Sequence, residues 1–163
     1  MTGSSRRRSV LLALTLGATA GCDQLSKAIA ARRLAGGATA ETLGGALRFE
    51  LAANRGAFLS LGSGLPEAVR FGLLVVLVGA GLAAGLALLL RDRRLPLAPA
   101  IGIAMVLGGG VGNLVDRLAR GSVTDFAVLG CGPFRTGVFN AADAAITLGA
   151  AIALVAWPRR GVH

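Results

Sequence analysis

Side chains that commonly bind metals or form nucleophilic pairs are scarce in this 163-residue chain. It has one histidine, His163 at its end, no tyrosine, and two cysteines, Cys22 and Cys131. A zinc site needs several histidine, cysteine or carboxylate ligands, and a Ser-His-Asp arrangement needs a histidine near the nucleophile. We therefore expect no metal site and no histidine-dependent catalysis. The cysteines can pair in an oxidising compartment, but two unpaired small side chains are favoured.

Aromatic residues make up only 4% of the chain, which bears on the meaning of its formal net charge of +9. Such a charge can indicate a nucleic-acid partner, but here the arginines lie in short clusters beside apolar runs. Clusters of this kind are typical of the flanks of membrane spans. The sequence therefore predicts no nucleic-acid binding.

Apolar residues account for 54% of the chain and give a mean hydropathy of +0.70, which indicates an integral membrane protein. About twenty apolar residues are needed to cross a bilayer. We predict an all-α membrane protein formed by one domain, 1–163, with spans at about 10–31, 71–90, 97–118 and 138–157. The span at 71–90 contains no charged residue and is the clearest of them.

The first predicted span has two interpretations. The apolar run 10–20 follows three arginines, as in a signal peptide, and the sequence before Cys22 resembles a loose lipoprotein cleavage box. The chain could then be a cleaved lipoprotein precursor acylated at Cys22. We favour a helix that continues to about residue 31, because three further spans follow. Asp23 and Lys27 then lie one turn apart and are expected to pair.

The segment at about 32–70 is too polar to span a membrane. Leu47, Phe49 and Leu51 alternate with polar residues, the period-two pattern of a half-buried strand. The sequence 54–56 then indicates a turn, and a second short apolar run follows at 57–61. A small hairpin or sheet is therefore expected outside the bilayer.

The orientation follows from where the basic residues cluster. The clusters at 6–8, 91–94 and 159–160 all fall on one side of four spans, which the positive-inside bias assigns to the cytoplasm together with both termini. The total number of basic residues does not decide the orientation. A set of polar residues then converges on the outer face: Asp23, Lys27, Asn54, Asn113, Asp125, Asn140 and Asp143.

Two acidic residues in this set, Asp125 and Asp143, are the candidate catalytic pair. The glycines and proline between them reverse the chain, so we expect both carboxylates at the same end of two neighbouring helices. Two carboxylates in a poorly hydrated site share one proton, which suits acid-base activation of water. Such a pair titrates as a unit, so the sequence does not assign the proton.

Other roles for the ionisable residues stay open. Asp116 and Arg117 are expected to form an ion pair or network that supports the fold. Proton or ion conduction also uses intramembrane acids, but the chain shows no repeat symmetry. Lys27 could act as base for a serine, with Ser26, Ser60 or Ser122 as nucleophile, although Asp23 would favour its charged form.

Five motifs occur in order along the chain. They are Asp23-Gln24-Leu25-Ser26-Lys27, Asn54-Arg55-Gly56-Ala57, Gly112-Asn113-Leu114-Val115-Asp116-Arg117, Gly121-Ser122-Val123-Thr124-Asp125-Phe126 and Phe139-Asn140-Ala141-Ala142-Asp143. With these motifs the chain resembles the lipoprotein signal peptidase family, signal peptidase II, from its first helix to its last.

The resemblance implies a multi-pass aspartyl endopeptidase of the bacterial inner membrane, with its active site towards the periplasm. Its substrates would be diacylglyceryl prolipoproteins, cut just before the lipidated cysteine, and globomycin would inhibit it. It implies Asp125 and Asp143 as catalytic residues, a small periplasmic β-cradle, contact with membrane lipid and no cofactor; we expect a monomer. The implied residues that support the site or bind substrate are Asp23, Lys27, Asn54, Gly56, Asn113, Asp116, Arg117 and Asn140.

The chain also departs from the family pattern. Phe58 and Leu59 stand where a small residue and then phenylalanine are usual, and Thr124 replaces a β-branched apolar residue. The connection 130–138 lacks the common proline before the last motif. These changes bear on substrate fit and inhibitor sensitivity. The alternative function is therefore an inactive or specialised paralogue that binds lipidated peptides.

Overall fold

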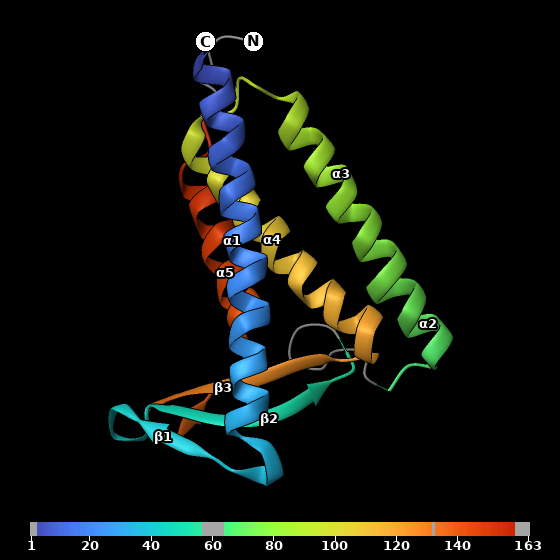
Figure 1. The fold of residues 1–163 in the computed structure, drawn as a ribbon, viewed down its shortest axis with the longest axis vertical. Coiled ribbons are helices and arrows are strands. Elements are labelled where there is room, and N and C mark those ends of the chain that lie inside the picture. Colours follow the sequence, from blue (N-terminus) through green and yellow to red (C-terminus); the bar gives the residue numbers. More distant parts are fainter. Residues whose placement is uncertain (1–2, 57–63, 132, 159–163) are drawn as a thin grey trace.

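The computed structural model describes residues 3–56, 64–131 and 133–158 (Figure 1). Its first helix, α1, runs over Gly3–Arg33 without interruption. The second helical segment begins as α2 (Glu67–Phe71), passes through a π-helical stretch (Gly72–Leu77) and continues as α3 (Val78–Arg91). The remaining helices are α4 (Leu97–Arg120) and α5 (Ala141–Val155). The prediction that the first helix continues past Cys22 is confirmed, and Cys22 is exposed and unpaired.

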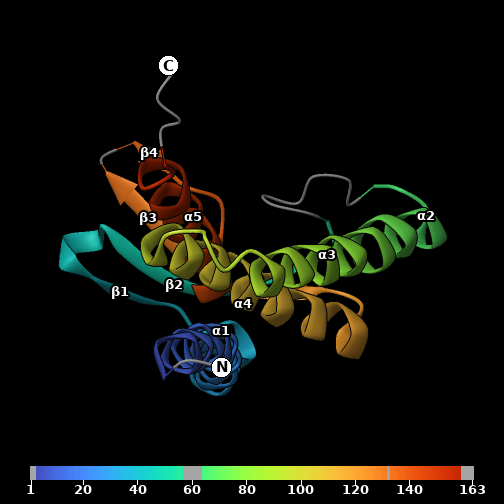
Figure 2. The same ribbon diagram turned by 90° about the horizontal axis from the view of Figure 1, so that it is seen from above.

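A central helix, α4, holds the helical part together. Figure 2 shows α1 on one side of α4 and α5 on the other, while α3 extends away from the group. Glycines permit the close approach, because a Cβ at Gly102 would meet the backbone of α5 and one at Gly108 would meet the backbone of α1. Small residues of this kind are what lets transmembrane helices pack closely.

The predicted combination of helices with a small sheet is confirmed. Within the described residues, two helices are long and apolar enough to cross a membrane. These are Glu67–Arg91 and Leu97–Arg120, while Ala141–Val155 is apolar but shorter. With 31 residues, α1 is also long, but it carries Asp23 and Lys27 among its apolar residues. That all four segments span the bilayer stays a prediction.

A four-stranded antiparallel sheet lies at the end of the bundle opposite the first turn of α1 (Figure 1). The order of its strands is β1 (Ala40–Thr42), β2 (Leu47–Asn54), β3 (Val123–Cys131) and β4 (Phe134–Arg135). The predicted strand at Leu47 is confirmed and extends to Asn54. The apolar run expected at 57–61 lies outside the described residues.

The prediction that Asp125 and Asp143 both lie at helix ends is wrong for Asp125. Gly121 ends α4 in a left-handed conformation with φ of 70°, and the chain then enters β3, which carries Asp125. Val123, Asp125 and Ala127 are buried on alternate positions, which is strand periodicity. The last helix begins at Ala141 rather than near 138, because Asn140 caps its N-terminus.

Candidate active site

The candidate site lies where β2, β3 and the first turn of α5 meet the sheet-side ends of α1 and α4. Strand pairing places Ala52 opposite Asp125 and Asn54 opposite Val123. A turn of α5 beside this pairing brings in Asp143, and Gly121 directs the chain from α4 into β3. The side chains of the site therefore come from several elements of the fold that are distant in the sequence.

Asp125 is almost completely buried, with 1% of its surface exposed. Its Oδ2 accepts a hydrogen bond from Asn54 Nδ2 at 3.0 Å, and its Oδ1 accepts one from Asn140 Nδ2 at 2.6 Å. Burial raises the pKa of the Asp125 carboxyl above its ordinary value and the charge of Asp143 adds to that rise, while the two amide hydrogen bonds and Lys27 lower it. Burial has the largest effect, so Asp125 retains a proton above the usual range for aspartate.

Asp143 is half-buried in the first turn of α5. It forms a capping box with Asn140: the Asp143 N–H donates to Asn140 Oδ1 at 3.0 Å, and the Asn140 N–H donates to Asp143 Oδ2 at 3.3 Å. Asn113 Nδ2 donates to Asp143 Oδ1 at 3.0 Å. Asn140 therefore contacts both carboxylates, since its side chain binds Asp125 and its backbone binds Asp143.

Arg117 links the segment after β2 to this pair. Its Nη2 donates to the Gly56 carbonyl oxygen at 2.7 Å, and the Gly56 N–H donates to Asn54 Oδ1 at 3.0 Å. Its charge also interacts with those of Asp143 and Asp125. Residues 54–56 are thus fixed beside the two carboxylates by contacts from α4.

A buried ion network centred on Lys27 joins α1 to α4 beside the site. Lys27 is 2% exposed, and its Nζ contacts Asp23 Oδ2 at 2.7 Å, Asp116 Oδ2 at 3.2 Å and Asn113 Oδ1 at 2.9 Å. An ammonium has three protons, and each has an acceptor here. The predicted pairing of Asp23 with Lys27 is confirmed.

Asp116 takes part in this network, as expected, but with partners other than Arg117. Among the described residues its ion-pair partners are Lys27 and Arg120, the latter at 2.6 Å. Arg117 turns instead towards Gly56. Asp116 Oδ2 also accepts the Thr124 N–H at 3.0 Å, which ties α4 to β3 next to Asp125.

Asp23 links α1 to α5 in the same way that Asp116 links α4 to β3. Its Oδ1 accepts the Ala142 N–H at 2.9 Å, one residue before Asp143. Gln24 was not predicted as a site residue, but its Nε2 donates to Gly112 O at 3.1 Å and to Asp116 Oδ1 at 3.2 Å. Its position directly after Asp23, next to the apolar run of α1, was the available signal.

Close packing around Asp23 leads to a first testable prediction. A Cβ at Gly112 would overlap the Asp23 carboxylate, which Lys27 and Ala142 hold in place. Gly112→Ala should therefore destabilise the protein by about 1–3 kcal/mol, the usual cost of overpacking. The matched control is Gly17→Ala in α1, where a Cβ meets nothing within 4 Å. Thermal unfolding in detergent measures both, and equal stabilities would contradict the prediction.

The serine-lysine alternative receives no support from these contacts. The Ser26 hydroxyl donates to the backbone oxygen of Asp23 at 2.8 Å rather than to Lys27. Lys27 Nζ instead contacts the carboxylates of Asp23 and Asp116 and the side-chain oxygen of Asn113. Ser60 lies outside the described residues.

The structure thus brings the predicted site residues to one end of the helices. They are Asp23, Lys27, Asn54, Gly56, Asn113, Asp116, Arg117, Asp125, Asn140 and Asp143. Across residues 3–56, 64–131 and 133–158, no three His, Cys, Asp or Glu side chains are grouped as a metal site would require. The arrangement offers two carboxylates from different elements, joined through one asparagine.

Comparison with known proteins points to one family. A family model described as signal peptidase (SPase) II matches residues 15–158. Proteins named lipoprotein signal peptidase from Parasynechococcus marenigrum and an Azoarcus species are each 38% identical to this chain, over 148 and 149 residues. These matches cover 91% and 90% of this chain and 88% and 81% of the relatives.

Solved structures support the fold. Two structures of a bacterial membrane enzyme superpose with a TM-score of 0.77 over 90% of this chain, and cover 86% and 91% of those chains. Their sequence identity of 23% makes this a similarity of fold alone.

Proposed function

The chain belongs to the signal peptidase II family, the membrane proteases that process prolipoproteins, and from this premise we propose that it is an aspartyl endopeptidase. It removes the signal peptide from diacylglyceryl-modified prolipoproteins by cutting just before the lipidated cysteine. Asp125 and Asp143 are its catalytic residues. The observation that carries this proposal is that Asn140 binds both carboxylates at once, one through its side chain and one through its backbone.

The two aspartates divide the acid and base roles between them. Burial favours a proton on Asp125, while Asp143 is less buried and accepts two N–H hydrogen bonds. In such a pair, one carboxylate takes a proton from the attacking water while the other donates its proton to the carbonyl oxygen of the scissile bond. Each oxygen of Asp125 accepts one amide hydrogen bond and keeps a second lone pair, so the asparagines orient the group without blocking it.

The remaining polar residues position this pair and its substrate. Asp23, Lys27 and Asp116 hold α1, α4, β3 and α5 together around it. Asn54, Gly56 and Arg117 present a fixed backbone segment beside it, against which the substrate backbone would lie.

The arrangement of the helices is compatible with a substrate that reaches the site from within the membrane. Helix α3 extends away from the others (Figure 1). Large apolar side chains are exposed on the turns before it, such as Phe71 in α2 and Val76 in the π-helical stretch. A lipidated substrate could approach laterally, with its acyl chains in hydrocarbon and its peptide bond at the sheet end. We further propose that the protein is a monomer in the inner membrane, with both termini in the cytoplasm and the site towards the periplasm. We also propose that globomycin inhibits it.

The pH dependence of cleavage should follow the Asp125 carboxyl. Because its pKa is raised, the pair keeps its shared proton above the pH at which a free aspartate ionises, and activity should fall as the pH rises through that raised pKa. Asn54→Ala removes a hydrogen bond that favours the ionised form, so the alkaline limb should move to higher pH. Rates for the parent and the variant across the pH range measure this. An unchanged limb would contradict it.

The function itself is tested with purified protein and a diacylglyceryl prolipoprotein. Mass spectrometry should detect a released signal peptide and a product that begins with the lipidated cysteine. The same prolipoprotein without lipid is the control and should remain uncut. If the lipidated substrate binds but no product appears, the chain is the non-catalytic lipopeptide-binding protein instead.

A further inference from the structure

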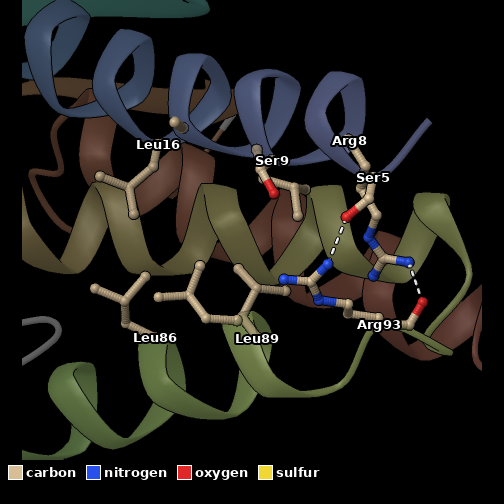
Figure 3. Close-up of a pocket in the computed structure, with 10 residues that line it drawn as sticks. Ser5, Arg8, Ser9, Leu16, Leu86, Leu89 and Arg93 are labelled. Carbon is tan, nitrogen blue, oxygen red and sulfur yellow. Dashed lines mark hydrogen bonds between the residues drawn. The ribbon is translucent and has the colours of Figure 1, made fainter. Parts of the chain in front are cut away.

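A second feature lies far from the aspartates, at the opposite end of the helices. A cavity of about 650 Å³ lies between the first turns of α1 and the last turns of α3 (Figure 3). None of the residues that line this cavity takes part in the proposed catalysis. Its lining is Ser5, Arg8, Ser9, Leu12, Ala13, Leu16, Leu86, Leu89, Leu90 and Arg93.

This cavity is polar at one end and apolar along the rest. Figure 3 shows Arg8 and Arg93 at one end, with Leu16 and Leu86 at the other. Leu12 and Leu89 are buried in its wall and belong to the packed core formed by α1, α3 and α4. A ligand that fills the cavity must therefore present an anion at one end and a hydrocarbon chain along the other.

The two arginines are held in place by backbone and hydroxyl oxygens. Arg8 Nη1 donates to the Arg93 carbonyl oxygen at 2.9 Å, and Arg93 Nη1 donates to Ser5 Oγ at 2.6 Å (Figure 3). A guanidinium has five N–H donors, so several remain available on each. In the part of the chain that the structure describes, neither guanidinium is paired with a carboxylate. Two like charges fixed side by side attract an anion.

We propose that this cavity binds an anionic phospholipid, with its phosphate on Arg8 and Arg93 and an acyl chain along the leucines. Basic pockets between helices at the cytoplasmic surface are suited to such headgroups. A free phosphate would leave the apolar wall uncovered, and a neutral lipid would leave the arginines without an anion. The basic end of a signal peptide would be repelled by both arginines.

Lipid binding to delipidated protein in detergent tests the proposal. Native mass spectrometry would compare phosphatidylglycerol with phosphatidylcholine of the same acyl chains, and inorganic phosphate as a third probe. The parent should bind phosphatidylglycerol more tightly than phosphatidylcholine. The double variant Arg8→Gln with Arg93→Gln should bind phosphatidylglycerol about thirty-fold more weakly, the loss expected when each arginine contributes about 1 kcal/mol.

Two further variants separate the cavity from the general charge of the protein. Arg6→Gln with Arg7→Gln removes the same charge from the same helix, but these arginines line a different surface with Val10, Leu11 and Leu14. The Arg6→Gln, Arg7→Gln variant should bind phosphatidylglycerol as tightly as the parent does. Ala13→Phe keeps every arginine and fills the apolar part of the cavity, so it should also lose the lipid. Thermal unfolding in the same detergent reports that each variant is folded.

Several results would overturn the lipid site. They are equal binding of the two lipids by the parent, an equal loss in the Arg6 and Arg7 control, and undiminished phosphatidylglycerol binding by Ala13→Phe. Binding of inorganic phosphate as tightly as phosphatidylglycerol would show that the site recognises an anion alone. Because the cavity is remote from Asp125, these outcomes are independent of the catalytic proposal.

Discussion

Replacing either Asp125 or Asp143 with asparagine should lower the rate of prolipoprotein cleavage by roughly 10²- to 10⁴-fold, the usual contribution of a general acid or base. An amide can neither take the proton from water nor donate one to the carbonyl oxygen. Because the aspartates act as a unit, the double variant should lose little more than either single variant. Initial rates with a diacylglyceryl prolipoprotein measure all three.

Part of this effect could come from altered packing, and the contacts show where. In Asp125→Asn the new amide NH₂ would face the NH₂ group of Asn54 or of Asn140, where two acceptor oxygens now stand. An unpaired buried donor costs about 1–3 kcal/mol, so some loss of stability accompanies the loss of activity. Rates must therefore be expressed per folded molecule, with unfolding monitored in the same detergent.

The matched control is Glu50→Gln on β2, the strand that also carries Asn54. Glu50 forms a partly exposed ion pair with Arg48 at 3.0 Å, and such pairs contribute at most about 1 kcal/mol. It should cleave at the rate of the parent. Full activity in Asp143→Asn, with the protein folded, would end the dyad proposal.

Lys27→Met should produce the largest loss of stability, about 3–5 kcal/mol, because it breaks a buried ion network on one side only. Asp23 and Asp116 would then remain buried without their shared cation. These carboxylates also bind the backbone N–H groups of Ala142 and Thr124, so the elements that carry Asp143 and Asp125 should loosen as well. Unfolding in detergent measures the first effect, and cleavage measures the second.

Arg120→Met offers a control that shares one partner with Lys27. Arg120 contacts Asp116 at 2.6 Å, closer than Lys27 does, but its side chain is 55% exposed. Solvent screens such a pair, so its loss should cost less than about 1 kcal/mol. If Lys27→Met is no less stable than Arg120→Met, the buried network does not hold the site together.

Local patterns in the sequence were sufficient for several parts of the fold. The charge-free run 71–90 predicts a helix, the alternation at Leu47 to Leu51 predicts a strand, and the spacing of Asp23 and Lys27 predicts their pairing. Each depends on residues within one or two turns of each other, where covalent geometry alone determines which side chains share a face. Resemblance to a known family identified further residues expected to support the site or bind substrate, such as Asn54 and Gly56.

Other parts could not be found in this way. The stretch around Asp125 was expected at a helix end, but it is a strand because residues 123–131 pair with β2, about 70 positions earlier in the chain. No local pattern specifies that pairing. Asp116 was likewise expected to interact with its neighbour Arg117, but its partners are Arg120, one turn along α4, and Lys27, which belongs to another helix.

The sequence by itself determined that this is an apolar, mostly helical protein with a small sheet, and which few ionisable residues it places among apolar ones. Only the tertiary structure decided that Asn140 joins Asp125 to Asp143, that Lys27 joins two aspartates, and that Arg8 and Arg93 share a cavity. The physical reason is the separation along the chain of the residues that interact. Composition and periodicity act over a few residues, whereas these contacts exist only because the helices and the sheet pack closely enough for residues distant in the chain to meet.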